Sequence, residues 1–317
     1  MNFSAKIKKE IIDKGVNHSC CKKAFLAGFI RSTGSIIRVG DSYGFECSTD
    51  IEPALNYAVR LFKDLYSFTE GETYTYPDKL NKKDRFSLEC VGEDAVAILF
   101  DLGILAYDDT GDFELRLKSN KELLDKECCI KAFIKGMFIG SGHCTLPDVK
   151  NPDTSTGYHL EVVFTHKVPA SDFAGYLARF GIFAKTITRR KATVVYIKSA
   201  EEISDFLALV NAPKAVLTVT DTIIKKQLKN NINRQKNCDI ANVTKQVLAY
   251  EKHIDAIRLI EQTIGLNELT EDIYNTAVAR RDNPDDTLME LALKLGITKS
   301  CLNHRLRKIL AIAEELK

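Results

Sequence analysis

Apolar and polar positions in the first two thirds of the chain follow one order twice: a helix, two strands, a helix, two strands and a closing helix. The first helix, at 20–33, recurs at 128–141 with its paired cysteines, a lysine, an Ala-Phe step and two glycines in the same places. Every match has the same offset, the 108 residues between Cys20 and Cys128. Self-similarity at a fixed spacing indicates a duplicated unit. We therefore predict an α+β domain of two tandem α-β-β-α-β-β-α units related by a pseudo-twofold axis.

The two predicted units extend over 1–111 and 112–229. In the first, Gly40-Asp41-Ser42 reads as a hairpin turn between two strands, and Pro53 opens an amphipathic helix. In the second, the polar loop LPDVKNPDTSTG precedes the first long strand. Strands are expected at 35–39, 43–48, 72–76, 85–90, 158–165, 185–190 and 193–198, and helices at 53–65, 94–102, 170–180, 200–210 and from 213 to about 228.

The pattern changes after residue 229. Segment 230–239 contains hardly any apolar residue besides Ile232, which is typical of a linker. Every later segment is patterned as helix, with ends marked by Gly265 and by Asn283-Pro284. We therefore predict an all-α domain over 240–317.

The last thirty residues have the pattern of a helix-turn-helix. Thr287 and Glu290 have the spacing of a capping box, Gly296 lies in a short turn, and Thr298 can cap the helix that follows. Apolar residues at helical spacing face a core, and polar and basic residues occupy the opposite face. In helix-turn-helix proteins the second helix enters the major groove of DNA. The predicted DNA-binding residues are Lys299, Ser300, Asn303, His304, Arg305, Arg307 and Lys308.

The chemistry of this face fits nucleic acid better than an ordinary solvated surface. Residues 294–308 include five basic side chains and no acidic one. Arginine makes bidentate contacts to guanine and asparagine to adenine. His304 is at best a groove or phosphate contact and argues for neither metal binding nor catalysis. Two interpretations of the basic residues around the linker have equal weight: they contact DNA phosphates, or they belong to an ordinary solvated connector. These residues are Lys225, Lys226, Lys229, Arg234 and Lys236.

Composition narrows the class of protein. The chain of 317 residues is 45% hydrophobic and 28% charged, as expected of a soluble globular protein, and no apolar run is long enough to cross a bilayer. The net charge is +2, and the 29 basic residues before residue 218 are matched by 29 acidic ones. A site for nucleic acid must therefore be local. The start of the chain has no signal-peptide core, which favours a cytoplasmic protein.

Nine cysteines are scattered along the chain. The pairs Cys20–Cys21 and Cys128–Cys129 are neighbours on predicted helices, where adjacent side chains point apart. Neither pair has the C-x-x-C spacing of a metal site, and no histidine lies in register beside either. We therefore expect free thiols in a reducing compartment, with no metal and no cofactor.

Each repeated helix carries a stripe of small residues: Ala24, Gly28 and Ser32 in the first copy, and Ala132, Gly136 and Gly140 in the second. Such stripes let helix backbones approach closely, so we expect the two copies to pack on each other at the pseudo-twofold axis. The alternative is that each helix packs separately under its own sheet.

The segment LAGFIRSTG (26–34) resembles the signature helix of LAGLIDADG homing endonucleases, and IKGMFIGSG (134–142) is a looser second copy. The resemblance implies that the two helices form the interface between the halves. It also implies that the penultimate residue of each copy, an acid in that family, holds the metal ions that cut DNA. Here those positions are Thr33 and Ser141. Neutral hydroxyls do not supply the anionic oxygens that Mg²⁺ needs, so we expect that the chain is not an enzyme.

The repeated domain shows no strong DNA-binding signal. Basic residues on its predicted strands, Lys185, Arg189, Arg190, Lys191 and Lys198, are offset by Glu46, Glu89, Glu114 and Glu161. Solvated sheet-edge charges explain this pattern at least as well as a DNA groove. The domain is therefore a candidate scaffold for a protein or ligand partner.

A LAGLIDADG-like domain followed by this helix-turn-helix resembles the WhiA family of Gram-positive bacteria. Matching segments are NPDTSTGYHLE (151–161), NCDIANVTKQ (237–246) and KSCLNHRLRKI (299–309). The resemblance implies a regulator that binds double-stranded DNA at the nucleoid. In filamentous actinobacteria the family is linked to sporulation, and in rod-shaped relatives to cell division and chromosome segregation. Actinobacterial members act with an iron–sulfur partner of the WhiB type, which nothing in this sequence shows.

Two other classes of function stay open. One is an active DNA endonuclease, which Thr33 and Ser141 disfavour. The other is a nucleoid or division scaffold whose main contacts are with protein.

Overall fold

The computed structural model describes residues 2–66, 72–78, 83–148, 151, 157–190 and 192–317. It divides into two compact units, Met1–Lys226 and Gln227–Lys317. Lys191 and most of segment 149–156, where a polar loop and one family-like motif are predicted, lie outside the described residues.

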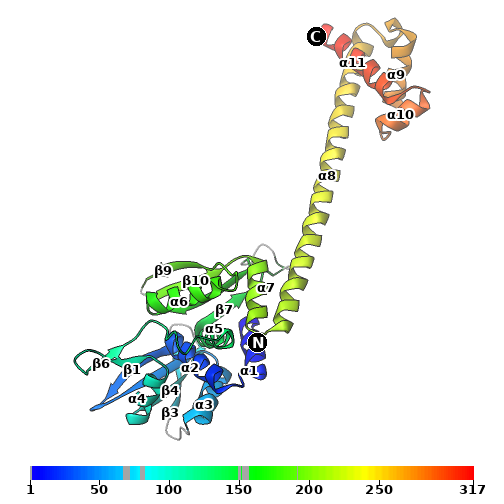
Figure 1. Cartoon of the computed structure of the whole chain (residues 1–317). Helices are drawn as coiled ribbons and strands as arrows, with labels where there is room; N and C mark the ends of the chain where they lie inside the picture. Colours follow the sequence, from blue (N-terminus) through cyan, green and yellow to red (C-terminus); the bar gives the residue numbers. More distant parts are fainter. Residues whose placement is uncertain (1, 67–71, 79–82, 149–150, 152–156, 191) are drawn as a thin grey trace. The chain divides into compact units, whose positions relative to one another are not determined.

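The first unit contains two four-stranded antiparallel sheets with the same strand order, β1-β2-β4-β3 and β7-β8-β10-β9 (Figure 1). This duplication confirms the predicted α+β fold. The first repeat contains α1 (Phe3–Lys14), α2 (Ser19–Thr33), β1 (Gly34–Val39), β2 (Ser42–Thr49), α3 (Glu52–Tyr66), β3 (Glu72–Asp78), β4 (Lys83–Val91) and α4 (Glu93–Asp101). The second contains α5 (Glu127–Ser141), β7 (Gly142–Thr145), β8 (His159–Phe164), α6 (Lys167–Ala178), β9 (Lys185–Arg189), β10 (Ala192–Ile197) and α7 (Ala200–Leu209).

A short hairpin between the repeats does not appear in the sequence pattern. It consists of β5 (Leu105–Tyr107) and β6 (Phe113–Leu115). Strands of three residues are too short to show an alternating pattern. The hairpin is instead held by aromatic packing, with the rings of Tyr107 and Phe113 5.8 Å apart and Phe100 against both.

Helices α2 and α5 pack directly against each other in the middle of the unit (Figure 1). A Cβ atom built on Gly28 would lie 2.3 Å from the Phe133 carbonyl oxygen, and one on Gly136 would lie 2.0 Å from that of Phe25. Only glycine permits so close an approach of two backbones. The predicted contact between the two copies is confirmed, and the alternative of separate packing is wrong.

The second unit is all-helical. The boundary between the units falls within α8 (Pro213–Thr263), a helix of 51 residues. After it come the 3₁₀ turn η2 (Leu266–Glu268) and then α9 (Glu271–Asp282), α10 (Leu288–Lys294) and α11 (Lys299–Glu315). Side chains from α8, α9, α10 and α11 form one buried apolar cluster, which includes Ile257, Ala277, Leu291, Leu302 and Ile309.

The prediction of a non-helical linker at 230–239 is wrong, because this segment lies inside α8. Its polar residues reflect exposure and not irregular backbone. The segment contains neither proline nor glycine, the two residues that interrupt helices, so nothing in it prevents a polar, solvent-exposed helix.

Candidate nucleic-acid interface

The local signals of the helix-turn-helix are all present in the structure. The hydroxyl of Thr287 accepts a hydrogen bond from the backbone N–H of Glu290, whose carboxylate accepts one from the Thr287 N–H, so the capping box is complete. Gly296 has φ 64°, a left-handed conformation that glycine adopts without strain, and it ends α10. Thr298 then caps α11 through the Cys301 N–H. These contacts fix the direction of α11.

The apolar side of α11 anchors the helix in the core of the second unit. Leu302, Leu306 and Ile309 are almost fully buried. The opposite side is solvent-exposed at five of the seven predicted DNA-binding positions, and Asn303 is half-buried beside them. The exposed five are Lys299, Ser300, His304, Arg307 and Lys308. Six of the predicted residues are therefore at least partly accessible to solvent.

Arg305, the seventh predicted residue, has a different environment. Its guanidinium forms an ion pair of 2.9 Å with Asp272 of α9, and its side chain is 17% exposed. This contact ties α11 to α9 through the two terminal nitrogens of the guanidinium. The sequence pattern does not reveal this contact, because Asp272 lies thirty-three residues earlier in the chain.

In the part of the first unit that the structure describes, an acidic group lies beside some of the predicted basic strand residues. Arg189 lies 3.9 Å from Glu161, and the imidazole of His159 is 2.9 Å from the same carboxylate. Arg190 has a positive φ in the turn after β9. Around Arg189 the positive charge is therefore locally offset by Glu161.

The C-terminal ends of α2 and α5 border a polar cleft of about 600 Å³. Thr33 and Ser141, at the positions that carry metal-binding acids in homing endonucleases, both line it. The Thr33 hydroxyl donates to the Phe29 carbonyl of its own helix at 2.7 Å. In the part of the chain that the structure describes, the buried Ser141 hydroxyl has no hydrogen-bond partner. The helix ends therefore offer no anionic ligands, and a catalytic Mg²⁺ does not fit them.

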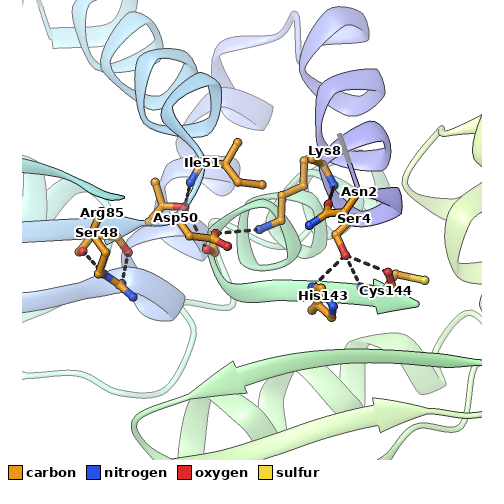
Figure 2. Close-up of polar contacts among 12 residues, drawn as sticks. Asn2, Ser4, Lys8, Ser48, Asp50, Ile51, Arg85, His143 and Cys144 are labelled. Carbon is orange, nitrogen blue, oxygen red and sulfur yellow. Dashed lines mark hydrogen bonds and ion pairs between the residues drawn. The ribbon is translucent and has the colours of Figure 1, made fainter. Parts of the chain in front are cut away.

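The charged residues of this cleft come from other elements (Figure 2). Lys8 of α1 extends toward Asp50, with 3.9 Å between Nζ and Oδ1. The Lys8 side chain is only 2% exposed, and burial lowers its pKa to about 8, against the opposing effect of Asp50. Arg85 donates to the Ser48 hydroxyl at 3.0 Å, and Asp84 lies beside it on the rim. The cleft is therefore a mixed-charge site.

A second polar contact fastens α1 to β7 at the same cleft. The Ser4 hydroxyl lies 2.9 Å from His143 Nδ1 and accepts a hydrogen bond from the Cys144 backbone N–H (Figure 2). No spacing in the sequence reveals these contacts, because they join residues about 140 positions apart.

The first unit has two LAGLIDADG-like halves, with Thr33 and Ser141 at the positions of the metal-binding acids, and the second unit contains a helix-turn-helix. This combination defines a class of proteins in which a fold of the homing-endonuclease type is followed by a helix-turn-helix domain. Family models agree over most of the chain: the WhiA N-terminal LAGLIDADG-like domain matches residues 19–105, the WhiA LAGLIDADG-like domain 130–229, and the WhiA C-terminal HTH domain 232–313. The chain belongs to the WhiA family.

Curated relatives and a solved structure agree with this assignment. A probable cell division protein WhiA of Bacillus cereus (strain B4264) is 33% identical over 320 residues, which is 100% of this chain and 98% of the relative. The similarly named protein of Bacillus mycoides (strain KBAB4) is 32% identical over the same length. The crystal structure of full-length DUF199/WhiA from Thermatoga maritima aligns with a TM-score of 0.57 at 23% identity, covering 99% of both chains. That likeness supports the fold.

Proposed function

We propose that this chain is a sequence-specific DNA-binding regulator of cell division, chromosome segregation or sporulation, and that it acts at the nucleoid in the cytoplasm. The observation that carries the proposal is the outer face of α11, where Ser300, Asn303, His304 and Arg307 lie on one side of a helix anchored in a core. Side chains on such a face reach base edges when the helix lies in the major groove. Its curated relatives are named as probable cell division proteins, which supports the cellular role.

The test is a fluorescence-anisotropy titration of duplex DNA with the full chain at several salt concentrations. The variant is Asn303→Ala combined with Arg307→Ala. Each bidentate base contact contributes about 1–3 kcal/mol of discrimination, so the loss of two is expected to weaken specific binding by about thirtyfold or more. Binding to unrelated DNA, which depends on phosphates and salt, is expected to change much less.

A matched control removes the same side-chain types elsewhere in the second unit. Asn267 and Arg258 are both exposed and lie outside α10 and α11. An Asn267→Ala, Arg258→Ala variant carries the same change in net charge and is expected to keep both affinity and sequence preference. If the α11 variant and this control bind alike, α11 does not read bases and the proposal is refuted.

We further propose that the LAGLIDADG-like domain does not cleave DNA. The argument rests on Thr33, whose hydroxyl is committed to its own helix, and on the neutral Ser141. Incubation of plasmid DNA with the full chain and Mg²⁺ or Mn²⁺ is expected to leave it intact. Nicking that follows the protein through purification and disappears in a Lys8→Met, Asp50→Asn variant of the cleft would overturn this.

A second candidate function is a division or nucleoid scaffold that acts mainly through protein contacts. It is favoured by the exposed aliphatic side chains of α8, among them Ile240, Val243 and Val247, which lie at helical spacing. Duplex binding that leaves transcription of neighbouring genes unchanged would favour the scaffold over the regulator.

A further inference from the structure

Four thiols meet where α2 and α5 begin. Two come from each helix, and the sulfur atoms of Cys20, Cys21, Cys128 and Cys129 all lie within 4.8 Å of one another. They form the one group of at least three potential metal ligands among the residues that the structure describes. Cys21 and Cys129 are buried, Cys20 is half-buried and Cys128 is exposed, so the cluster is embedded in protein yet open to solvent on one side.

The close helix crossing explains why neighbouring cysteines converge. Ala24 lies four residues after Cys20 and three after Cys21, and both of these spacings bring side chains to one helix face. The second helix repeats the arrangement around Ala132. Because Gly28 and Gly136 bring the two backbones together just beyond, the four thiols enclose one point between the helices. The expectation that adjacent cysteine side chains point apart is wrong here, because it considered one helix at a time and not the crossing of two.

The positions of the four cysteines follow the twofold symmetry of the repeat. The pseudo-twofold operation relates Cys20 to Cys128 and Cys21 to Cys129, so each helix contributes one buried thiol and one less buried thiol. An ion between the helices would therefore meet equivalent ligands from the two halves.

We propose that Cys20, Cys21, Cys128 and Cys129 bind one Zn²⁺ ion as a structural, tetrahedral tetrathiolate site. Zinc–sulfur bonds of about 2.3 Å put the sulfur atoms of a tetrahedron about 3.8 Å apart, so the observed spacing needs only a small contraction. An iron–sulfur cluster divides its cysteines among several iron atoms and needs wider spacing. Four protein ligands leave no open position, which makes the site structural and not catalytic.

The surroundings offset the negative charge of a zinc tetrathiolate. All four cysteines lie in the first turns of α2 and α5, where the positive ends of two helix dipoles meet. Lys126 lowers the pKa of Cys20 through its positive charge, and the pKa of Lys135 is raised by its electrostatic interaction with Cys21, although burial lowers it overall. Bound zinc would link the first half of the domain to the second. This inference does not depend on DNA binding.

The test uses the tag-free full chain, kept reduced, loaded with Zn²⁺ and dialysed before elemental analysis. We expect about one zinc per chain and a higher melting temperature after loading. Replacing Zn²⁺ with Co²⁺ should give the intense visible bands of tetrahedral cobalt and near-ultraviolet sulfur-to-cobalt charge transfer. These spectra report the ligands directly, without reference to any variant.

Two variants complete the experiment. Cys20→Ala with Cys128→Ala removes the two least buried ligands and should abolish zinc retention, the cobalt bands and the melting shift. Cys238→Ala with Cys301→Ala removes two cysteines outside the cluster and should leave all three unchanged. The single variant Cys128→Ala, at an exposed position that leaves the core untouched, should weaken binding and diminish the charge-transfer band.

Three results would overturn the proposal. The first is a wild-type protein that retains no more zinc than the Cys20→Ala, Cys128→Ala variant. The second is a cobalt complex without charge transfer from sulfur. The third is peptide mapping that finds Cys20–Cys129 and Cys21–Cys128 disulfides formed while Zn²⁺ is in excess, which would make the cluster a redox site.

Discussion

The close packing of α2 against α5 gives a prediction whose sign opposes that of intrinsic helix propensity. In an isolated helix, replacing glycine by alanine stabilises by about 1 kcal/mol. At Gly136, however, the new Cβ would lie 2.0 Å from the Phe25 carbonyl oxygen and 2.9 Å from the Phe29 nitrogen. Both are backbone atoms, so neither can move away by rotation of a side chain. We therefore expect Gly136→Ala to destabilise the first unit.

The magnitude follows from the geometry. Ordinary contact begins at about 3.4 Å, so α2 and α5 would have to separate by about 1.4 Å at this point. Overpacking of this kind costs about 3 kcal/mol or more, and a gap of even 0.5–1 Å forfeits about a quarter to a half of the dispersion energy of neighbouring contacts. After the gain in propensity is subtracted, the net loss is about 2–3 kcal/mol. For a unit of this size that lowers the melting temperature by about 4–12 °C.

The assay is thermal unfolding followed by far-ultraviolet circular dichroism, with Gly175→Ala as the matched control. Gly175 also lies within a helix, α6, but a Cβ there meets no heavy atom within 4 Å. Its variant should be as stable as the wild type or more stable by up to about 1 kcal/mol. If Gly136→Ala matches or exceeds the wild type, as Gly175→Ala should, the close crossing of α2 and α5 is wrong, and with it the convergence of the four thiols.

Two further predictions concern buried titratable groups. The pKa of Lys8 is about 8 in the folded state, below the 10.5 of an exposed lysine. Between pH 8 and 10.5 the unfolded chain therefore binds more protons than the folded chain, so stability should rise with pH across this range. Lys8→Met should raise the melting temperature at pH 7 and remove that rise; an unchanged pH profile would contradict the argument. Burial, and secondarily the charge of Arg280, lowers the pKa of His253 to about 4. Between pH 6.5 and 4 the unfolded chain therefore binds more protons than the folded chain, so the second unit should lose stability as pH falls through this range. His253→Leu should reduce this acid sensitivity in pH-dependent melting curves, and an equally steep loss in the variant would refute the assignment.

Local patterns in the sequence were sufficient for features whose causes are local. The caps at Thr287 and Thr298 and the turn at Gly296 involve residues within four positions of one another, so spacing alone predicts them. The duplication likewise appears as a repeated apolar pattern. Because the two halves repeat one pattern, the second sheet is expected to have the same strand order as the first. The glycines of the two signature helices likewise predict that these helices pack closely against each other.

Features that join distant positions were decided by the tertiary structure. The cleft charges Lys8, Asp50 and Asp84 come from separate elements, and the pairing of Arg305 with Asp272 depends on how α9 packs against α11. The continuity of α8 through 230–239 was missed because low hydropathy reports exposure and not backbone conformation.

The cysteine cluster shows the same division most clearly. From the sequence, the two cysteines of each vicinal pair were expected to point apart, but in the structure their sulfur atoms lie within 4.8 Å of each other. Only the crossing of two helices at Gly28 and Gly136 brings four sulfur atoms within 4.8 Å of one another. Sequence by itself determined which elements form and that they are duplicated, because those depend on short-range periodicity. The tertiary structure decided which chemical groups meet, because that depends on the distance between backbones.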